Sequence, residues 1–177
     1  MKKVLATILA LVMALALCSV SWAAEPTSVN SAEELKTAIA TGGEIKLAAD
    51  ITLTSTLNLA KDVTIDGQGM YTIKAADNFT SGSDNKTACV LYVSAMVTLK
   101  DVTVNGNEKC RVIFCDKGKL TIDGATITNG KAPNFIGGVY MTSSASFEMN
   151  SGSIVGNKNV ENYQNDNYLQ YLSLIHI

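Results

Sequence analysis

A five-residue pattern of alternating apolar and polar side chains recurs four times along this chain, and it constrains the fold more than any other feature. Each copy has an apolar third residue with polar neighbours on both sides, which is the period of a β-strand with one buried face. The four copies are Val63-Thr64-Ile65-Asp66-Gly67, Val97-Thr98-Leu99-Lys100-Asp101, Leu120-Thr121-Ile122-Asp123-Gly124 and Phe147-Glu148-Met149-Asn150-Ser151.

Apolar residues also recur at fixed offsets outside the pattern, which indicates repeats that stack in one register. One copy is too small to bury its own apolar face, so neighbouring copies must share a core. We therefore predict an all-β fold in which residues 44–157 form a single-stranded parallel β-helix with three strands per coil. The inward positions expected in the first strand are Leu57, Leu91, Phe114 and Met141, and those in the third strand are Met70, Val104, Ile127 and Ile154. An antiparallel sandwich of short strands is the alternative.

The copies are unevenly spaced, although the run from the first to the third strand keeps its length. We expect all the extra residues between the third strand of one copy and the first strand of the next. Insertions in repeat proteins gather on one face in this way, and that face is often the binding face.

The N-terminal part of the chain has the features of a targeting segment followed by a helix. Residues 1–23 combine two lysines, an apolar run and small residues before a cleavage point, so we predict a signal peptide. Residues 24–30 are expected to be a linker. Ser31 and Glu34 form a capping box, and Gly42-Gly43 ends an apolar stripe, so residues 31–43 are predicted to be a helix that covers the first coil.

The mature chain is mildly acidic and, after the leader, has no apolar run long enough to span a membrane. Because the predicted signal peptide directs export, we expect an extracellular protein, secreted or on the cell surface, and the mild acidity gives no reason to expect nucleic acid as a partner.

Two C-terminal segments do not follow the repeat. Residues 158–171 are polar and are left without a place in the register. Residues 172–177 read Leu-Ser-Leu-Ile-His-Ile, which looks like the translation of a sequencing adapter; we therefore expect the natural chain to continue differently, with a tail strand as the alternative. Uncapped strand edges at this end are expected to favour self-association.

Three cysteines remain after the predicted leader, in a compartment that permits disulfides. A Cys89–Cys110 bridge between neighbouring coils is one hypothesis, and a buried Cys89 thiol is the alternative. Cys115 is expected to face outward. The chain has no CxxC motif, and no metal centre is predicted.

Two groups of polar residues are candidates for chemistry. Asp66, Lys100 and Asp123 share one outward position on successive coils, where they form either a carboxylate pair around a sugar or, as we favour, a charge ladder. The insertion corner supplies acid, amide and aromatic side chains that suit sugar hydroxyls or calcium, with ordinary polar loops as the alternative. Its members are Asp77, Asn78, Asp84, Asn85, Asn107, Glu108, Arg111, Asn134 and Phe135.

Gly137-Gly138-Val139-Tyr140, followed by Phe147-Glu148-Met149-Asn150, resembles the paired repeats of polymorphic outer membrane proteins. More broadly, residues 31–157 are similar to bacterial surface proteins of the pectate-lyase-like right-handed β-helix superfamily. The resemblance implies a right-handed coil. It also implies that a lyase would use an arginine, for which Arg111 is the one candidate, with calcium held by clustered aspartates, a cluster that this chain lacks.

The sequence therefore favours a non-catalytic, adhesin-like or glycan-binding surface protein whose partner is an extracellular glycan or a surface protein. One alternative is a polysaccharide lyase or glycoside hydrolase whose active coils are partly missing. The other is a structural spacer within a larger surface protein.

Overall fold

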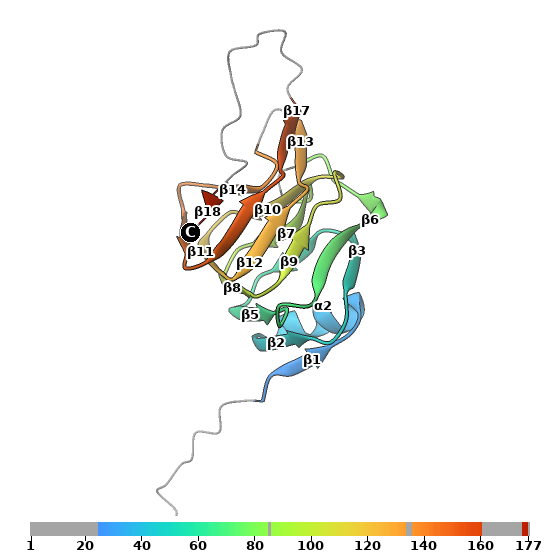
Figure 1. Cartoon of the computed structure of the whole chain (residues 1–177), viewed down its shortest axis with the longest axis vertical. Coiled ribbons are helices and arrows are strands. Elements are labelled where there is room, and N and C mark those ends of the chain that lie inside the picture. Colours follow the sequence, from blue (N-terminus) through green and yellow to red (C-terminus); the bar gives the residue numbers. More distant parts are fainter. Residues whose placement is uncertain (1–24, 85, 134–135, 161–174, 177) are drawn as a thin grey trace, which may run out of the picture.

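The computed structural model describes residues 25–84, 86–133, 136–160 and 175–176 (Figure 1). The predicted signal peptide, and residues 161–174 of the C-terminal segments, lie outside the described residues. Within them the fold is all-β apart from one helix, α2 (Ala32–Thr41), and the strands are mostly parallel. None of the described helices is long and apolar enough to cross a membrane.

Three larger sheets and one strand pair make up the fold. Sheet A contains, in spatial order, β1 (Thr27–Val29), β2 (Gly43–Leu47), β5 (Val63–Asp66), β8 (Met96–Lys100), β11 (Gly118–Asp123) and β15 (Ala145–Met149). Sheet B contains β3 (Ile51–Ser55), β6 (Thr72–Thr80), β9 (Thr103–Asn105), β12 (Ala125–Thr128), β16 (Gly152–Val155) and β18 (Ile175–His176). Sheet C contains β4 (Leu57–Leu59), β7 (Cys89–Val93), β10 (Arg111–Cys115) and β14 (Val139–Met141), and β13 (Lys131–Pro133) pairs with β17 (Lys158–Val160).

From β2 onward the chain visits sheets A, B and C in a fixed order, and each pass places one strand beside its predecessor in every sheet. We call one such pass a coil. Figure 1 shows the result for sheet B, in which β3, β6, β9 and β12 lie side by side. All strand pairs are parallel except β16 with β18, so the antiparallel sandwich is wrong. The arrangement is compatible with a β-helix.

The predicted register is confirmed in sheet A. Ile65 is opposite Leu99, Leu99 is opposite Ile122, and Ile122 is opposite Met149. Ile65, Leu99 and Ile122 are completely buried. The alternation of apolar and polar residues therefore identified the inward face of these strands correctly.

The predicted third strand is wrong in its first copy, because Ile73 and not Met70 is opposite Val104. Residues 67–71 form a tight turn in which Gly67 O accepts hydrogen bonds from Met70 N and Tyr71 N, both at 3.0 Å. The turn contains Gln68 at φ 58° and Gly69 at φ 70°, and it leaves Met70 68% exposed. The third strand therefore begins later in this copy than a fixed number of residues after Ile65 would place it.

The predicted first strand is wrong by one residue in the third copy and by two in the fourth. Leu57 and Leu91 do share a column, but Ile113 and Val139 continue it in place of Phe114 and Met141. The corner between sheets C and A lengthens along the chain, with Gly118 at φ 81° in one of its turns. Extra residues are thus not confined to the insertion corner.

The segment expected to be a linker contributes a strand, since residues Thr27–Val29 pair in parallel with β2. Val29 is buried because it lies opposite Leu47, where β1 forms the N-terminal edge of sheet A. The assignment of residues 24–30 to a linker is therefore corrected.

Helix α2 begins and ends where the capping pattern predicts. Ser31 Oγ accepts a hydrogen bond from Glu34 N at 3.3 Å, and Glu34 Oε2 accepts one from Asn30 N at 2.8 Å. Gly42 ends the helix at φ 85°. The buried residues Leu35, Ala38 and Ile39 belong to the same core cluster as the inward residues of the coils, so the helix covers the core beside β1, β2 and β3.

Candidate functional site

The insertion corner brings together two of its predicted residues. The Asn107 amide donates to Asp77 Oδ1 at 2.9 Å and to Ala75 O at 3.1 Å, which joins β6 to the turn after β9. Asn107 is held at φ 49° by the hydrogen bond from its backbone N–H to Asn105 Oδ1, at 2.8 Å. The Asn107 amide, with Lys74 and Lys109 nearby, lowers the pKa of the Asp77 carboxyl.

A second link at this corner spans more of the chain. Lys158 Nζ lies 2.6 Å from Glu108 Oε1, and it lowers the pKa of that carboxyl. Lys158 lies in β17, which pairs with β13, so the excursions at this corner also stack on each other. Lys158 belongs to the segment left without a place in the register, so its contact with Glu108 was not predicted from the sequence.

The other predicted members of the corner do not join this group. Asp84 Oδ1 accepts hydrogen bonds from Thr87 N and Thr87 Oγ1, at 2.8 and 2.9 Å, in a separate loop. Asn78 is exposed on β6. Asn85, Asn134 and Phe135 lie outside the described residues.

Arg111 is not part of an exposed corner, and this prediction is corrected. It lies on β10 and is only 2% exposed. Its Nε donates to Ile136 O at 2.9 Å, and its guanidinium carbon lies 4.8 Å from the Tyr140 ring centre and 5.8 Å from that of Phe114. Burial lowers the pKa of Arg111. These contacts hold the side chain in a packed environment.

The rings near Arg111 form an aromatic ladder that was not predicted from the sequence; it consists of Tyr92, Phe114 and Tyr140. Successive ring centres are 5.9 and 5.5 Å apart, with interplanar angles of 22° and 16°. Phe114 is opposite Tyr92 and Tyr140 in the strand register, so one aromatic residue per coil occupies the same place. An aromatic residue followed by an apolar one, at the end of each of these strands, was the available signal.

Charged groups surround the Tyr92 end of the ladder. The Tyr92 hydroxyl donates to Asp116 Oδ2 at 2.8 Å, and Lys86 Nζ lies 3.8 Å from the same oxygen and 5.7 Å from the ring centre. Burial and the Asp116 carboxylate raise the pKa of Tyr92 to about 12. The phenol therefore stays protonated at physiological pH, where it serves as a donor.

The cysteines differ from two of the predictions. Cys89, Cys110 and Cys115 are all free and buried, so the proposed Cys89–Cys110 bridge is absent from the structure. Cys115 is completely buried and belongs to the core cluster, so it does not face outward. Burial raises the pKa of Cys89 and Cys110 to about 12 and that of Cys115 to about 11, which makes all three poor nucleophiles.

The charge ladder is present, but its members have different surroundings. Asp66 and Asp123 both lie opposite Lys100, and Lys100 Nζ is 3.1 Å from Asp66 Oδ2. The hydrogen bond to Asp66 raises the pKa of Lys100. Asp66 is only 5% exposed and also accepts a hydrogen bond from Gln68 N, whereas Asp123 is half-buried and accepts one from Ser151 Oγ.

This geometry does not suit a carboxylate pair acting on a sugar. The two aspartates are separated by two strand spacings, about 10 Å. A retaining glycosidase places its carboxylates about 5 Å apart, and an inverting one leaves room for a water molecule between them. Here the Lys100 side chain occupies the intermediate coil.

The remaining catalytic candidates are not brought together. Arg111 lies in sheet C, whereas Asp123 lies in sheet A. Over the described part of the chain, no three His, Cys, Asp or Glu side chains gather in a way that could hold a metal ion.

A buried amide supports the insertion corner from inside. Asn157 is 7% exposed; its Oδ1 accepts a hydrogen bond from Gly130 N at 2.8 Å, and its amide donates to Ile127 O at 2.9 Å. It thereby ties the last described turn of sheet B to the preceding coil. The Gly156-Asn157 pair predicted a turn at this corner, but it did not indicate that the Asn157 side chain would be buried.

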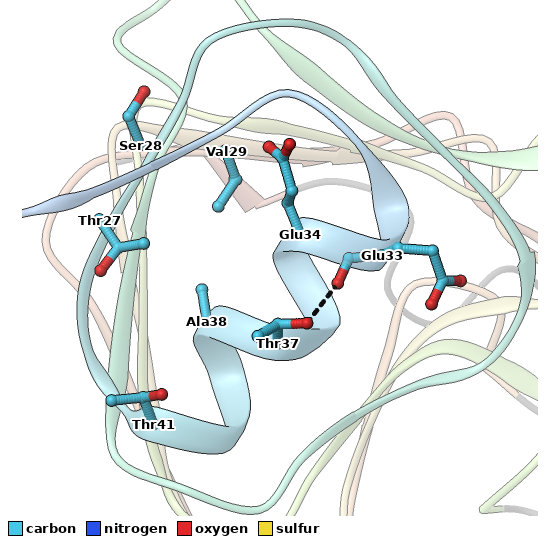
Figure 2. A pocket seen from close by; sticks show the side chains of 8 residues that line it. All are labelled: Thr27, Ser28, Val29, Glu33, Glu34, Thr37, Ala38 and Thr41. Carbon is cyan, nitrogen blue, oxygen red and sulfur yellow. Dashed lines mark hydrogen bonds between the residues drawn. The ribbon is translucent and has the colours of Figure 1, made fainter.

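An open groove of about 370 Å³ lies between α2 and β1. Figure 2 shows Val29 and Ala38 between the two elements, with threonine and glutamate side chains around them. Thr37 Oγ1 donates to Glu33 O at 2.9 Å, which is a bond within the helix. The groove contains none of the residues predicted for chemistry.

Comparisons with known proteins found no matching protein-family model, no matching curated protein and no matching solved structure.

Proposed function

We propose that this chain is a right-handed parallel β-helix exposed outside the cell, which binds a glycan or a surface protein through its insertion corner and acts without turnover. The fold part of the proposal is supported by the cyclic order of the three sheets and by the parallel register from coil to coil. Crossovers between parallel strands of one sheet are almost always right-handed, which supports the hand. The resemblance to pectate-lyase-like surface proteins points the same way.

The observation that carries the binding proposal is the bonded row of polar groups at the insertion corner. Asp77, Asn107, Glu108 and Lys158 are joined in pairs across coils. Because these side chains are already held in place, they lose little conformational entropy when their remaining lone pairs and N–H groups bind sugar hydroxyls or a polar protein surface. Asn78 on β6 adds an exposed amide beside Asp77.

The absence of turnover is proposed from the contacts of the catalytic candidates. Asp66 is paired with Lys100, and Arg111 is packed against aromatic rings. These contacts stabilise the fold, whereas a catalytic group would have to face the substrate.

A structural spacer is the second candidate, and one specific observation favours it. The charged groups of the corner neutralise each other, as in the Glu108–Lys158 pair, and exposed pairs of this kind are common where no ligand binds. A spacer would use the corner only to keep the coils aligned.

A binding assay on the full chain separates these functions. We expect binding to at least one member of a glycan array or to an intact cell surface, and a loss of about tenfold or more in Asp77→Ala/Asn78→Ala, which removes roughly 1.4 kcal/mol of contacts. Asn58→Ala is the matched control, because Asn58 is also an exposed strand asparagine but lies in sheet C.

Three outcomes would contradict the proposal. Binding to no ligand would favour the spacer, and equal binding by the corner variant and by the control would place the contact surface elsewhere. Release of unsaturated or reducing sugar ends from pectin, abolished by Asp123→Ala or Arg111→Ala in protein that remains folded, would favour a lyase or hydrolase.

A further inference from the structure

Each of four successive coils places one lysine at the insertion corner. Lys74 lies on β6, Lys109 follows β9, and Lys131 and Lys158 lie on β13 and β17, which follow β12 and β16. We call these four residues the lysine row. Because neighbouring strands are about 4.8 Å apart, the row extends over about 14 Å along the coil stack.

The segments that carry the lysine row lie side by side. Lys74 is on the strand that pairs with β9, opposite Asn105 and shortly before Lys109 in the next coil. Lys131 N donates a hydrogen bond at 2.9 Å to the carbonyl oxygen of the residue that follows Lys109. Lys158 is opposite Lys131, and Figure 1 shows their strands β17 and β13 next to each other. The row therefore follows the stack from coil to coil.

The lysine row outnumbers the carboxylates on which it acts. The pKa of Asp77 is lowered first by the Asn107 amide and then by the charges of Lys74 and Lys109. The lysines of β17 and β13 lower the pKa of Glu108, chiefly through the ion pair described above. Four cations thus face two anions, an excess of two positive charges on a chain whose net charge is −2.

Most of these cations are accessible to a ligand. Among the described residues, Lys158 is the one member of the row that forms an ion pair. Lys74 and Lys109 are exposed, and Lys131 is half-buried. A row of exposed cations of this kind creates a positive potential that attracts a polyanion.

The carboxylates beside the row restrict which polyanion fits. A polymer with charge on every accessible group would place some of its charges against Asp77 and Glu108, which would repel them. A sulfated polysaccharide offers sulfates to the ammonium groups and hydroxyl donors to the carboxylate oxygens, which only accept hydrogen bonds. A polyuronate offers both as well, but its lower charge density makes its attraction to the row weaker.

We propose that the insertion corner binds a sulfated polysaccharide that runs along the coil stack, with its sulfates on the lysine row. Its hydroxyls bind Asp77, Glu108 and the exposed Asn78 side chain. This inference rests on the binding function proposed above and names the chemical class of the ligand. The lysines supply an attraction that salt screens, whereas the hydrogen bonds to the hydroxyls are less sensitive to salt.

The experiment measures the binding of the full chain to immobilised dextran sulfate, with polygalacturonate and uncharged dextran as comparison ligands. We expect dextran sulfate to bind at least about tenfold more tightly than polygalacturonate, and dextran to bind more weakly still. Raising the ionic strength from about 0.1 M to about 1 M shortens the Debye length from about 10 Å to about 3 Å, so it should abolish the binding of dextran sulfate.

A pair of variants assigns this binding to the lysine row. Lys74→Gln/Lys109→Gln should weaken the binding of dextran sulfate by about tenfold, because it removes two exposed cations from the corner. Lys36→Gln/Lys61→Gln is the matched control, since it removes the same charge from exposed lysines of α2 and of the segment before β5. The control should bind as the wild type does, and circular dichroism checks that both variants remain folded.

The outcomes separate this inference from the proposed function. A wild type that does not bind dextran sulfate, an equal loss in both lysine variants, or equal affinity for polygalacturonate or single-stranded DNA would overturn the inference. Binding to a neutral glycan or a cell surface that Asp77→Ala/Asn78→Ala weakens and Lys74→Gln/Lys109→Gln does not would overturn the inference alone. Binding to no glycan and no cell surface would overturn both.

Discussion

At the scale of single residues, Arg111 shows how a charged side chain becomes part of the packing. It is 2% exposed, yet its cation lies on two aromatic rings and its Nε bonds a backbone carbonyl. The planar guanidinium suits both contacts at once, and an ammonium group would not. The charge therefore contributes to folding through contacts that only arginine makes here.

Replacing Arg111 with alanine should lower the free energy of unfolding by about 3 kcal/mol, through the lost ring contacts and an unpaired Ile136 carbonyl. Arg111→Lys should recover less than half of this loss. Urea unfolding midpoints measure both effects, and Lys109→Ala, at an exposed neighbour, should change stability by less than about 0.5 kcal/mol. An Arg111→Ala midpoint equal to the wild type would show that the ring contacts are not energetically important.

The buried thiols predict a loss of stability in alkali. Their pKa values of about 12, 12 and 11 lie above the ordinary value of 9.0, because burial disfavours the thiolate. A group whose pKa is raised on folding stabilises the native state fully below its unfolded pKa, and it loses that contribution as the pH rises toward the folded value. The free energy of unfolding should therefore fall between about pH 9 and pH 12.

Urea unfolding at several pH values measures this decline, and a variant with all three cysteines replaced by alanine should show a shallower one. The native thiols should also react slowly with a thiol reagent at pH 8 and quickly after unfolding. Rapid labelling of the native protein would contradict their burial.

At the scale of elements, a strand is stabilised by the coil on each side of it. Ile122 in β11 has inward neighbours on both sides, Leu99 and Met149, whereas Met149 in β15 has one among the strands that the structure describes. The same kind of truncation should therefore cost less at the end of the stack than in its middle.

Ile122→Ala should lower the free energy of unfolding by about 2–5 kcal/mol, the range for a buried aliphatic side chain that leaves a cavity. Met149→Ala should lower it by about 1 kcal/mol, since its side chain is only partly removed from water. Chemical denaturation of both variants tests the difference. Equal losses would show that Met149 is as well covered as Ile122, contrary to the exposure of the last coil.

The strands were predictable to the extent that their pattern is local. Alternation alone identified the inward column of Ile65, Leu99 and Ile122, because a pleated strand turns successive side chains to opposite faces. The corners were not predictable in the same way. The turn after Gly67 exchanges Met70 for Ile73, and its length depends on backbone bonds that apolar spacing does not encode.

In the candidate site, too, some residues were predicted correctly and others were not. Asn107 and Asp77 were expected at one corner and do meet there, since Asp77 lies in β6 and Asn107 follows β9, the strand that pairs with β6. Arg111 was expected with them, but it follows the corner and enters sheet C as part of β10. The aromatic ladder was missed because the fixed offset placed Phe114 in the inward column with Leu91 and Met141, whereas its partners in the register are Tyr92 and Tyr140.

At the scale of the whole molecule, the coils are linked mainly to their neighbours, so stability should vary along the stack. Amide hydrogen exchange should be slowest in β5, β8 and β11, and faster in β14 and β15, the last described strands of sheets C and A. Exchange measured by mass spectrometry on the full chain tests this gradient. Uniform protection in all the strands would indicate that the stack unfolds as one cooperative unit.

The pairing of every strand with its counterpart one coil away has an evolutionary consequence. A tandem duplication of the segment from Val97 to Lys119 would add one more pass and lengthen the molecule by about 4.8 Å, while its cross-section stayed the same. The new side chains would meet copies of the partners they already had. The length of the stack and the number of its corner groups could therefore change by simple gene events, without the need for a new core.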